Sequence, residues 1–462
     1  MAMMPVTDSM FLLAESREHP MHVGGLQLFQ PPDGAGPDHV SDLYRQLLAL
    51  DEVRPLFRRR PRGPVSSLGQ WAWTNDSDLD LEYHVRLSAL PRPGRVRELL
   101  ELASRLHGSL LDRHRPLWEF HLIEGLADGR FATYNKIHHA LLDGVSALRL
   151  LETTMSTDPS ETGLRAPWSP VERPAGDGRP EPGGGGFSPR RALQAVTGAA
   201  SDIAGLIPAF AKVANTVFRE QAGALPFQAP RSMLNVPITG ARRFAAQSYP
   251  LQRVHAVRKA AGATLNDVVM AMCSGALRQY MLDLGALPDK PLVAAVPVSL
   301  RSGDKDSDGG NAVGVILCTL ATDVIDPAKR LDAIRTSMQR GKRIYAGMSP
   351  LQITAISGLA LATMALSPIP GIVQFTPPPF NVMISNVPGP RRALYWNGAK
   401  LDGAYPMSIP YEGQALNITV TSYDGNLQFG LTGCRRSVPS LQRMLVHLEA
   451  SLAELEAVTG TV

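Results

Sequence analysis

The heptapeptide His138-His139-Ala140-Leu141-Leu142-Asp143-Gly144 joins a predicted strand to a predicted helix. Residues 131–137 before it (FATYNKI) predict the strand, and residues 145–152 after it (VSALRLLE) predict the first turns of the helix. Open sheets present their reactive groups where strands end and helices begin. Because successive strand residues point to opposite faces, we expect only one of the two histidines to face a given cavity.

Five further stretches of the chain support the same interpretation as this heptapeptide. They are Met21–Gly24 (MHVG), Arg115–Glu119 (RPLWE), Asn266–Val269 (NDVV), Pro297–Arg301 (PVSLR) and Ser385–Pro390 (SNVPGP). Together they resemble, in order, the motifs of the bacterial wax ester synthase/diacylglycerol acyltransferase family. That family belongs to a wider group of coenzyme-A-dependent acyltransferases that includes chloramphenicol acetyltransferase. The group shares the signature His-x-x-x-Asp-Gly, here His139 to Gly144, and the doubled histidine is typical of its lipid-forming branch.

The resemblance covers almost the whole chain and implies its architecture. We expect an α/β protein with two chloramphenicol-acetyltransferase-like mixed-sheet domains, a tunnel between them and the paired histidines in the middle of that tunnel. The predicted N-terminal acyltransferase domain covers residues 1–165, and the predicted C-terminal one covers residues 232–462. Between them, residues 166–190 are rich in Pro and Gly and predict a linker. Residues 191–231 predict a crossover helical segment, packed between the domains or lying on a lipid surface.

Composition limits the class of protein. Hydrophobic residues make up 44% of the 462 residues and charged residues 19%, which indicates a globular protein. The net charge of +4 is small for this length and does not favour a nucleic-acid partner. Three scattered cysteines favour a reducing compartment and argue against a disulfide framework or a zinc site.

The N-terminus lacks the pattern of a secretory signal. The most apolar window, 353–375, contains Pro368 and Pro370 and predicts a buried or surface-lying helix, not a membrane span.

Local patterns predict several regular elements. An apolar face repeats at helical spacing between Val96 and Leu110. Thr264 followed by Asp267 predicts a capped helix start, and Leu292–Val298 predicts a buried strand. The turn Asp424-Gly425-Asn426 predicts a hairpin, and leucines from 441 to 455 predict a closing amphipathic helix.

The transfer of an acyl group from a thioester to an alcohol requires the hydroxyl to lose its proton as it attacks. A base with a pKa near neutrality does this best, so His139, at the signature position, is the predicted general base. It could then return the proton to the departing thiolate, and no covalent acyl-enzyme is required. The chain has no Gly-x-Ser-x-Gly elbow, so a serine hydrolase mechanism has no support. His139 and Asp143 have no clustered third ligand nearby, so no metal is predicted.

Other motif residues carry alternative interpretations. His138 either orients the acceptor alcohol or packs behind the strand. Asp143 could act with His139 as a charge relay, but the resemblance implies instead that Asp143 turns away from the site and pairs with an arginine, for which Arg301 is the candidate. Gly144 is predicted to let the backbone turn tightly into the helix, and it could also leave room for the substrate.

Asn266 and Asn386 are polar residues in apolar surroundings, and either could donate to a developing oxyanion in the tunnel. The alternative is that Asn266 stabilises a helix start and Asn386 a turn before Pro388. Trp118 is predicted to be core packing, and Pro388-Gly389-Pro390 a rigid turn at the tunnel wall.

The resemblance implies an acyltransferase that esterifies a long-chain acyl group from acyl-coenzyme A onto diacylglycerol to give triacylglycerol. Long-chain fatty alcohols, which would give wax esters, are the second acceptor class. Acyl-coenzyme A is then a co-substrate, and no permanently bound cofactor is expected. The expected location is the cytoplasm, peripheral to the inner face of the membrane or to lipid droplets. The alternatives are an acyltransferase for a polar metabolite alcohol and a non-catalytic lipid-droplet protein.

Overall fold

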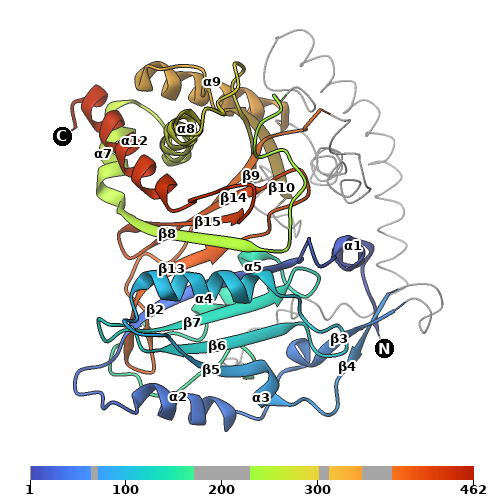
Figure 1. Ribbon diagram of the computed structural model, residues 1–462. Coiled ribbons are helices and arrows are strands. Elements are labelled where there is room, and N and C mark those ends of the chain that lie inside the picture. The colour runs from blue at the N-terminus through green and yellow to red at the C-terminus, as the bar shows by residue number, and fades with distance from the viewer. Residues whose placement is uncertain (1, 64–70, 171–228, 301–311, 346–376, 462) are drawn as a thin grey trace, which may run out of the picture.

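Two six-stranded mixed sheets, one above the other in Figure 1, frame the part of the chain that the structure describes. This computed structural model describes residues 2–63, 71–170, 229–300, 312–345 and 377–461. A smaller three-stranded sheet in the order β1-β4-β3 lies at one edge of the lower part. The predicted two-domain α/β fold with mixed sheets is confirmed.

The first sheet has the strand order β12-β13-β2-β7-β6-β5. Its neighbouring strands are antiparallel except β5 and β6, which are parallel. The described residues before 171 are called the first half, and those from 229 onward the second half. The strands of the first half are β1 (Ala2–Met3), β2 (His22–Gln30), β3 (Arg59–Arg62), β4 (Ala72–Asn75), β5 (Val85–Ala89), β6 (Trp118–Glu124) and β7 (Phe131–His138). The helices are α1 (Val6–Ala14), α2 (His39–Leu48), η1 (Pro55–Arg58), α3 (Leu81–His84), α4 (Val96–Gly108) and α5 (Gly144–Glu152).

The second sheet has the strand order β10-β9-β11-β14-β15-β8 and is also mixed, with β11 parallel to both of its neighbours. The strands of the second half are β8 (Arg242–Pro250), β9 (Val293–Leu300), β10 (Ala312–Thr319), β11 (Val382–Val387), β12 (Tyr395–Trp396), β13 (Ala399–Met407), β14 (Leu416–Tyr423) and β15 (Asn426–Cys434). Its helices are α7 (Leu251–Ala260), α8 (Leu265–Asp283), α9 (Pro327–Tyr345) and α12 (Arg443–Thr459).

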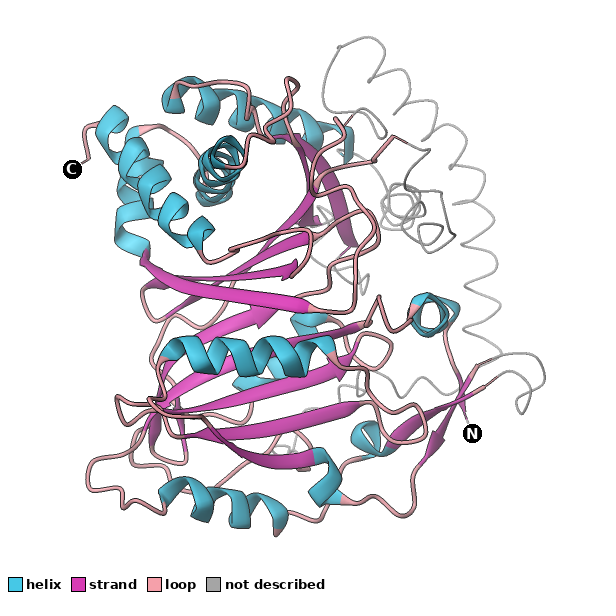
Figure 2. Ribbon diagram, in the orientation of Figure 1, coloured by secondary structure: helices cyan, strands magenta, loops and turns pink. Residues whose placement is uncertain are grey.

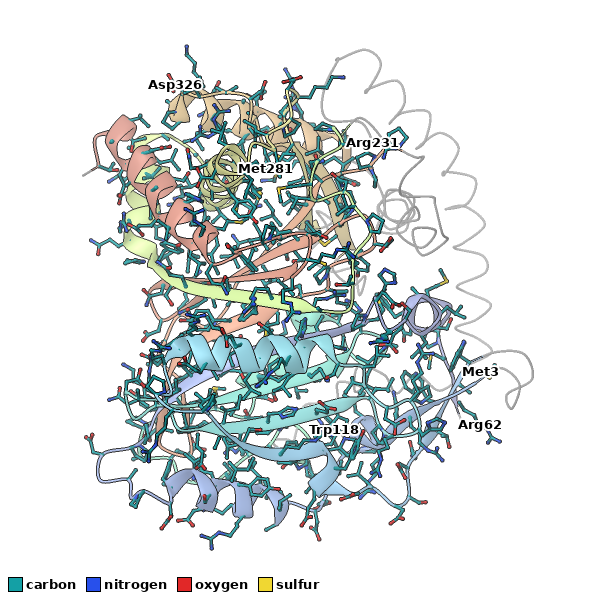
Figure 3. All side chains as sticks on the ribbon, viewed as in Figure 1. Met3, Arg62, Trp118, Arg231, Met281 and Asp326 are labelled. Carbon is teal, nitrogen blue, oxygen red and sulfur yellow. The ribbon has the colours of Figure 1, made fainter. Side chains whose placement is uncertain are left out.

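Helices cover the outer faces of the pair of sheets, and one helix lies between the two halves. Figure 2 shows the helices of the second half gathered above its sheet, where α8 packs against α7, α9 and α12. Met281 of α8 lies within this helical layer, whereas Trp118 lies in the lower half (Figure 3). Helix α4 packs against β8 of the other half, and the Phe244 backbone N–H donates to the Ser104 hydroxyl across 2.9 Å. The two halves therefore share a buried interface.

Strand β13 crosses from the second half into the first sheet. It runs antiparallel to β2, with Lys400 opposite Gln30 and Met407 opposite Gly24. In Figure 1 it is the orange strand beside the blue and cyan strands of the lower sheet. The predicted C-terminal domain of residues 232–462 therefore contributes two strands, β12 and β13, to the N-terminal sheet. The sequence did not predict this exchange, because a β-pattern indicates a strand but not the sheet that it joins.

The predicted linker begins too early. Its first residues, Ala166 and Trp168, have exposed fractions of 4% and 0%, and the Trp168 ring stacks on Trp118 with centroids 5.2 Å apart. A single aromatic residue among prolines has no periodicity, so the pattern gave no sign that it joins the core. Residues 171–190 of the predicted linker and residues 191–228 of the crossover segment lie outside the described residues. So does the apolar window 353–375.

The other local predictions are confirmed by α4, α8, β9, the β14–β15 hairpin and α12. The Thr264 hydroxyl accepts from the Asp267 N–H across 3.2 Å, and the Asp267 carboxylate accepts from the Thr264 N–H across 2.8 Å. Asp424 and Gly425 have positive φ angles of 40° and 76°, as a tight hairpin turn requires. Trp118 is 2% exposed and packs in the core, as predicted.

No single helix among the described residues is long and apolar enough to cross a membrane. The bent pair formed by α7 and α8 passes the same test of length and composition, and most of α8 is buried inside the protein.

Candidate active site

His139 follows the last residue of β7, where the chain leaves the sheet toward α5. Strand β7 is held between β2 and β6, and His138 lies opposite His22 in the register with β2. The His139 backbone N–H donates to the Met21 carbonyl across 2.9 Å. Helix α5 begins at Gly144, so the strand-to-helix placement of the heptapeptide is as predicted.

His139 is half-buried and lies beside an apolar cluster formed by both halves. Its ring stacks on Phe11 of α1, with centroids 4.1 Å apart and planes 21° from parallel. This cluster, called the junction cluster below, joins residues of the first half to residues of the loop that follows β13. Its members are Phe11, Ala14, Met21, Val23, Ala147, Ile409 and Tyr411. An apolar surface formed by both halves therefore lies beside the predicted base.

The electrostatic setting keeps His139 neutral. Burial lowers the pKa of its ring from 6.5 to about 4, and the neighbouring His138 ring acts in the same direction. Asp143 and a hydrogen bond of the ring to its own backbone raise the pKa only in part. A neutral imidazole keeps one ring nitrogen with a free lone pair, and that nitrogen can accept a proton.

Asp143 caps helix α5. Its side chain is exposed, and its carboxylate accepts the Ser146 backbone N–H across 2.7 Å. Aspartate is among the preferred residues at this position, so the strand-to-helix pattern at Asp143 could have predicted the cap. Arg301 lies outside the described residues, and its pairing with Asp143 stays a prediction.

His138 is enclosed within the protein, with an exposed fraction of 0%. The Ala140 backbone N–H donates to its Nδ1 across 3.1 Å, so that nitrogen acts as an acceptor. Its Nε2 then carries the proton and lies 3.3 Å from the Glu15 carboxylate. This arrangement corresponds to the packing interpretation of His138. Sequence reasoning missed Glu15, which is distant from the motif in the chain.

Asn266 and Asn386 lie together although 120 residues separate them. The Asn386 side-chain amide donates to the Asn266 side-chain oxygen across 3.3 Å. Asn266 is in the first turn of α8, and Asn386 is in strand β11, not in a turn. Both side chains are partly accessible.

Gly144 and Gly389, two glycines of the motifs, differ in whether a side chain would fit at their positions. Gly144 has no left-handed φ, and a Cβ built on it meets no atom within 4 Å. The open space fits the interpretation that Gly144 leaves room for the substrate, and the backbone does not require glycine there. A Cβ on Gly389, in contrast, would lie 2.3 Å from the Ser422 carbonyl oxygen, so the Pro388-Gly389-Pro390 turn needs glycine to approach β14.

Comparison with known proteins agrees with this geometry. Residues 3–269 match the wax ester synthase/diacylglycerol acyltransferase catalytic domain, and residues 309–456 match the C-terminal domain of the same proteins. The chain belongs to the wax ester synthase/diacylglycerol acyltransferase family. The family predicted from the motifs is thereby confirmed.

Individual members of the wax ester synthase/diacylglycerol acyltransferase family match over their full length. A putative diacylglycerol O-acyltransferase of Mycobacterium bovis is 54% identical over 458 residues, which cover 99% of each protein. The solved wax ester synthase/diacylglycerol acyltransferase of Marinobacter aquaeolei is 45% identical, with a TM-score of 0.79 over 100% of both chains.

More distant structures share only the fold of this family. The starter condensation domain of rhizomide synthetase is 13% identical, with a TM-score of 0.55 over 99% of this chain and 94% of that one.

Proposed function

We propose that this protein transfers a long-chain acyl group from acyl-coenzyme A to diacylglycerol, and also to long-chain fatty alcohols. The products are triacylglycerol and wax ester. The observation that carries the proposal is a neutral His139 at the strand-to-helix junction, beside an apolar cluster from both halves. The Mycobacterium bovis and Marinobacter relatives carry the names of these two activities.

In the proposed reaction, the neutral His139 ring removes the proton of the acceptor hydroxyl as the hydroxyl oxygen attacks the thioester carbonyl. The new C–O bond forms, the C–S bond breaks, and the imidazolium returns the proton to the thiolate of coenzyme A. A base that is neutral at pH 7 is ready for the first of these steps. Asp143 keeps the start of α5 in place through its capping bond.

The Asn266–Asn386 pair is the proposed donor to the tetrahedral oxyanion. The Asn386 amide occupies the Asn266 oxygen, which turns the Asn266 NH₂ group away from Asn386. That NH₂ group is the donor in this proposal, and Asn386 orients it. Preorganised donors of this kind contribute most where charge develops in the transition state.

Acceptors of low water solubility favour a reaction at a lipid surface. We propose a cytoplasmic location peripheral to the inner membrane face or to lipid droplets. Three apolar side chains near the N-terminus support it: Met10 and Leu13 of α1 are 42% and 64% exposed, and Met3 is 54% exposed. Met3 lies on the same side of the molecule as α1 (Figures 1 and 3). Replacement of Met10 and Leu13 by glutamate should lower co-sedimentation with diacylglycerol-containing vesicles. Unchanged co-sedimentation would contradict this surface.

Thiol release from palmitoyl-coenzyme A by the purified protein, with and without dioleoylglycerol, tests the proposed activity. We expect release that depends on the lipid alcohol, with triacylglycerol formed in equal amount. His139→Ala should lose about 10²–10⁴-fold in rate while it stays folded. Release that needs a polar alcohol instead of a lipid would favour the polar-metabolite alternative. No release with any alcohol would favour a non-catalytic lipid-droplet protein.

A further inference from the structure

Glu15 lies directly after helix α1 and has a buried carboxylate. One of its oxygens contacts Met21 and His138, which both adjoin His139, and the other binds Arg113. The Glu15 side chain is 1% exposed. One oxygen accepts two bonds from the Arg113 guanidinium, 3.0 Å from Nε and 2.9 Å from the terminal nitrogen. The other accepts the Met21 backbone N–H across 3.2 Å and lies 3.3 Å from His138 Nε2.

The partners of Glu15 also hold His139. The Met21 N–H donates to the Glu15 carboxylate, and the Met21 carbonyl oxygen accepts the His139 N–H, so a single residue joins the two. His138 is the neighbour of His139 in the chain. Helix α1 ends at Ala14, directly before Glu15, and its Phe11 stacks on the His139 ring. The Glu15 backbone N–H donates to the Phe11 carbonyl across 3.1 Å.

A carboxylate buried in this position is stable only if both of its oxygens have polar partners, because burial of an unpaired charge is costly. Burial raises the pKa of Glu15, but the His138 ring, the Met21 N–H and Arg113 hold it below the ordinary value. Glu15 is therefore ionised at neutral pH. Arg113 also donates to the Leu12 carbonyl across 2.7 Å, which ties the same guanidinium to the last turn of α1.

The second half of the chain holds the segment between Glu15 and Met21. His19 Nε2 lies 2.7 Å from the Glu412 carboxylate, and Arg242 donates to the Glu18 carbonyl across 2.9 Å. Glu412 follows Tyr411 of the junction cluster. The segment is thus fixed at Glu15 by the first half and at residues 18 and 19 by the second.

We propose that Glu15 is a positioning residue for His139. It sets the depth and orientation of the imidazole by holding Met21, His138 and the end of α1 in one arrangement. The inference rests on the proposed role of His139 as the general base. Glu15 touches no reacting atom, so its removal should change the chemical step and leave substrate affinity nearly intact.

Glu15→Gln is the direct test, because it keeps the shape and an oxygen for the Met21 N–H but removes the charge that Arg113 needs. With palmitoyl-coenzyme A and dioleoylglycerol, we expect kcat to fall by about 10²-fold, the cost of a base misplaced by about 1 Å. KM for palmitoyl-coenzyme A should change by less than about threefold, since the interaction lost is made only in the transition state. Glu18→Gln is the matched control, because it removes the same charge from an exposed side chain of the same segment.

His138 supplies a second, independent readout. In His138→Gln, the amide can accept the Ala140 N–H and donate to Glu15, so most of kcat should be retained. His138→Ala loses both contacts and should behave like Glu15→Gln. The Glu15→Gln/His138→Ala double variant should be no worse than the worse single variant, because the two residues act as one unit.

Wild-type kcat in folded Glu15→Gln, or losses that multiply in the double variant, would overturn the inference. If Glu15→Gln does not fold, Arg113→Lys keeps a cation but removes the paired bonds, and the same loss of kcat at constant KM is expected. An inactive His139→Ala with a fully active Glu15→Gln would reject only the positioning role. An active His139→Ala would reject the proposed function itself.

Discussion

The side-chain amide of Asn386, in strand β11, donates to the side-chain oxygen of Asn266, at the start of helix α8. Neither residue is near the other in the chain, and the contact fixes which way the Asn266 amide faces. Asn266 therefore presents its NH₂ group with its oxygen already engaged. The helix start itself is held by the separate capping box of Thr264 and Asp267.

Asn266→Ala should lose about 10²–10³-fold in kcat, the usual cost of removing one oxyanion donor. Thermal stability should change little, because the capping box remains. Asn386→Ala should lose less, since Asn266 stays present but is no longer oriented. Steady-state kinetics at saturating palmitoyl-coenzyme A would show whether kcat falls further in Asn266→Ala than in Asn386→Ala. A harmless Asn266→Ala with a damaging Asn386→Ala would reverse the assignment of the two residues.

The pH dependence of activity should reflect the lowered pKa of His139. Its folded-state value of about 4 lies below the ordinary 6.5, with burial as the main cause. The acidic limb of kcat/KM, which reports the free enzyme, should therefore have its midpoint nearer to 4 than to 6.5. Between these values only the unfolded chain takes up the proton, so this residue also removes stability as pH falls from 6.5 toward 4. An acidic midpoint at or above 6.5 would show that the ring is not shielded as described.

The sequence predicted what depends on local patterns and left out what depends on tertiary contacts. The strand before His139, the helix after Gly144 and the Asp424–Gly425 hairpin follow from periodicity and turn residues, and the structure has all three. Glu15 could not be predicted as a partner of His138. No local pattern relates residues so far apart, and a buried glutamate has the same sequence signal as an exposed one.

Asp143→Ala should destabilise helix α5 by about 1 kcal/mol, the typical cost of losing an N-cap side chain. Asp143→Asn should be nearly neutral in stability, because asparagine caps a helix about as well. Thermal unfolding of the two variants would measure the difference. If Asp143→Asn is as destabilised as Asp143→Ala, the charge of Asp143 matters more than the cap, and the predicted pairing with Arg301 would gain support.

The first half of the chain should be inactive when it is expressed alone. Strand β2, which leads from Met21 into the first sheet, is paired on one side with β13, a strand of the second half. Without β13, β2 becomes an exposed sheet edge, and exposed apolar edges promote aggregation. The junction cluster also loses Ile409 and Tyr411.

We therefore expect residues 1–170 to be poorly soluble and to release no thiol from palmitoyl-coenzyme A, whereas co-expression with residues 171–462 should restore both solubility and turnover. Residues 1–165, which lack the buried Trp168, should be rescued less well. If residues 1–170 alone turned over palmitoyl-coenzyme A, the second half could not be needed to build the active site.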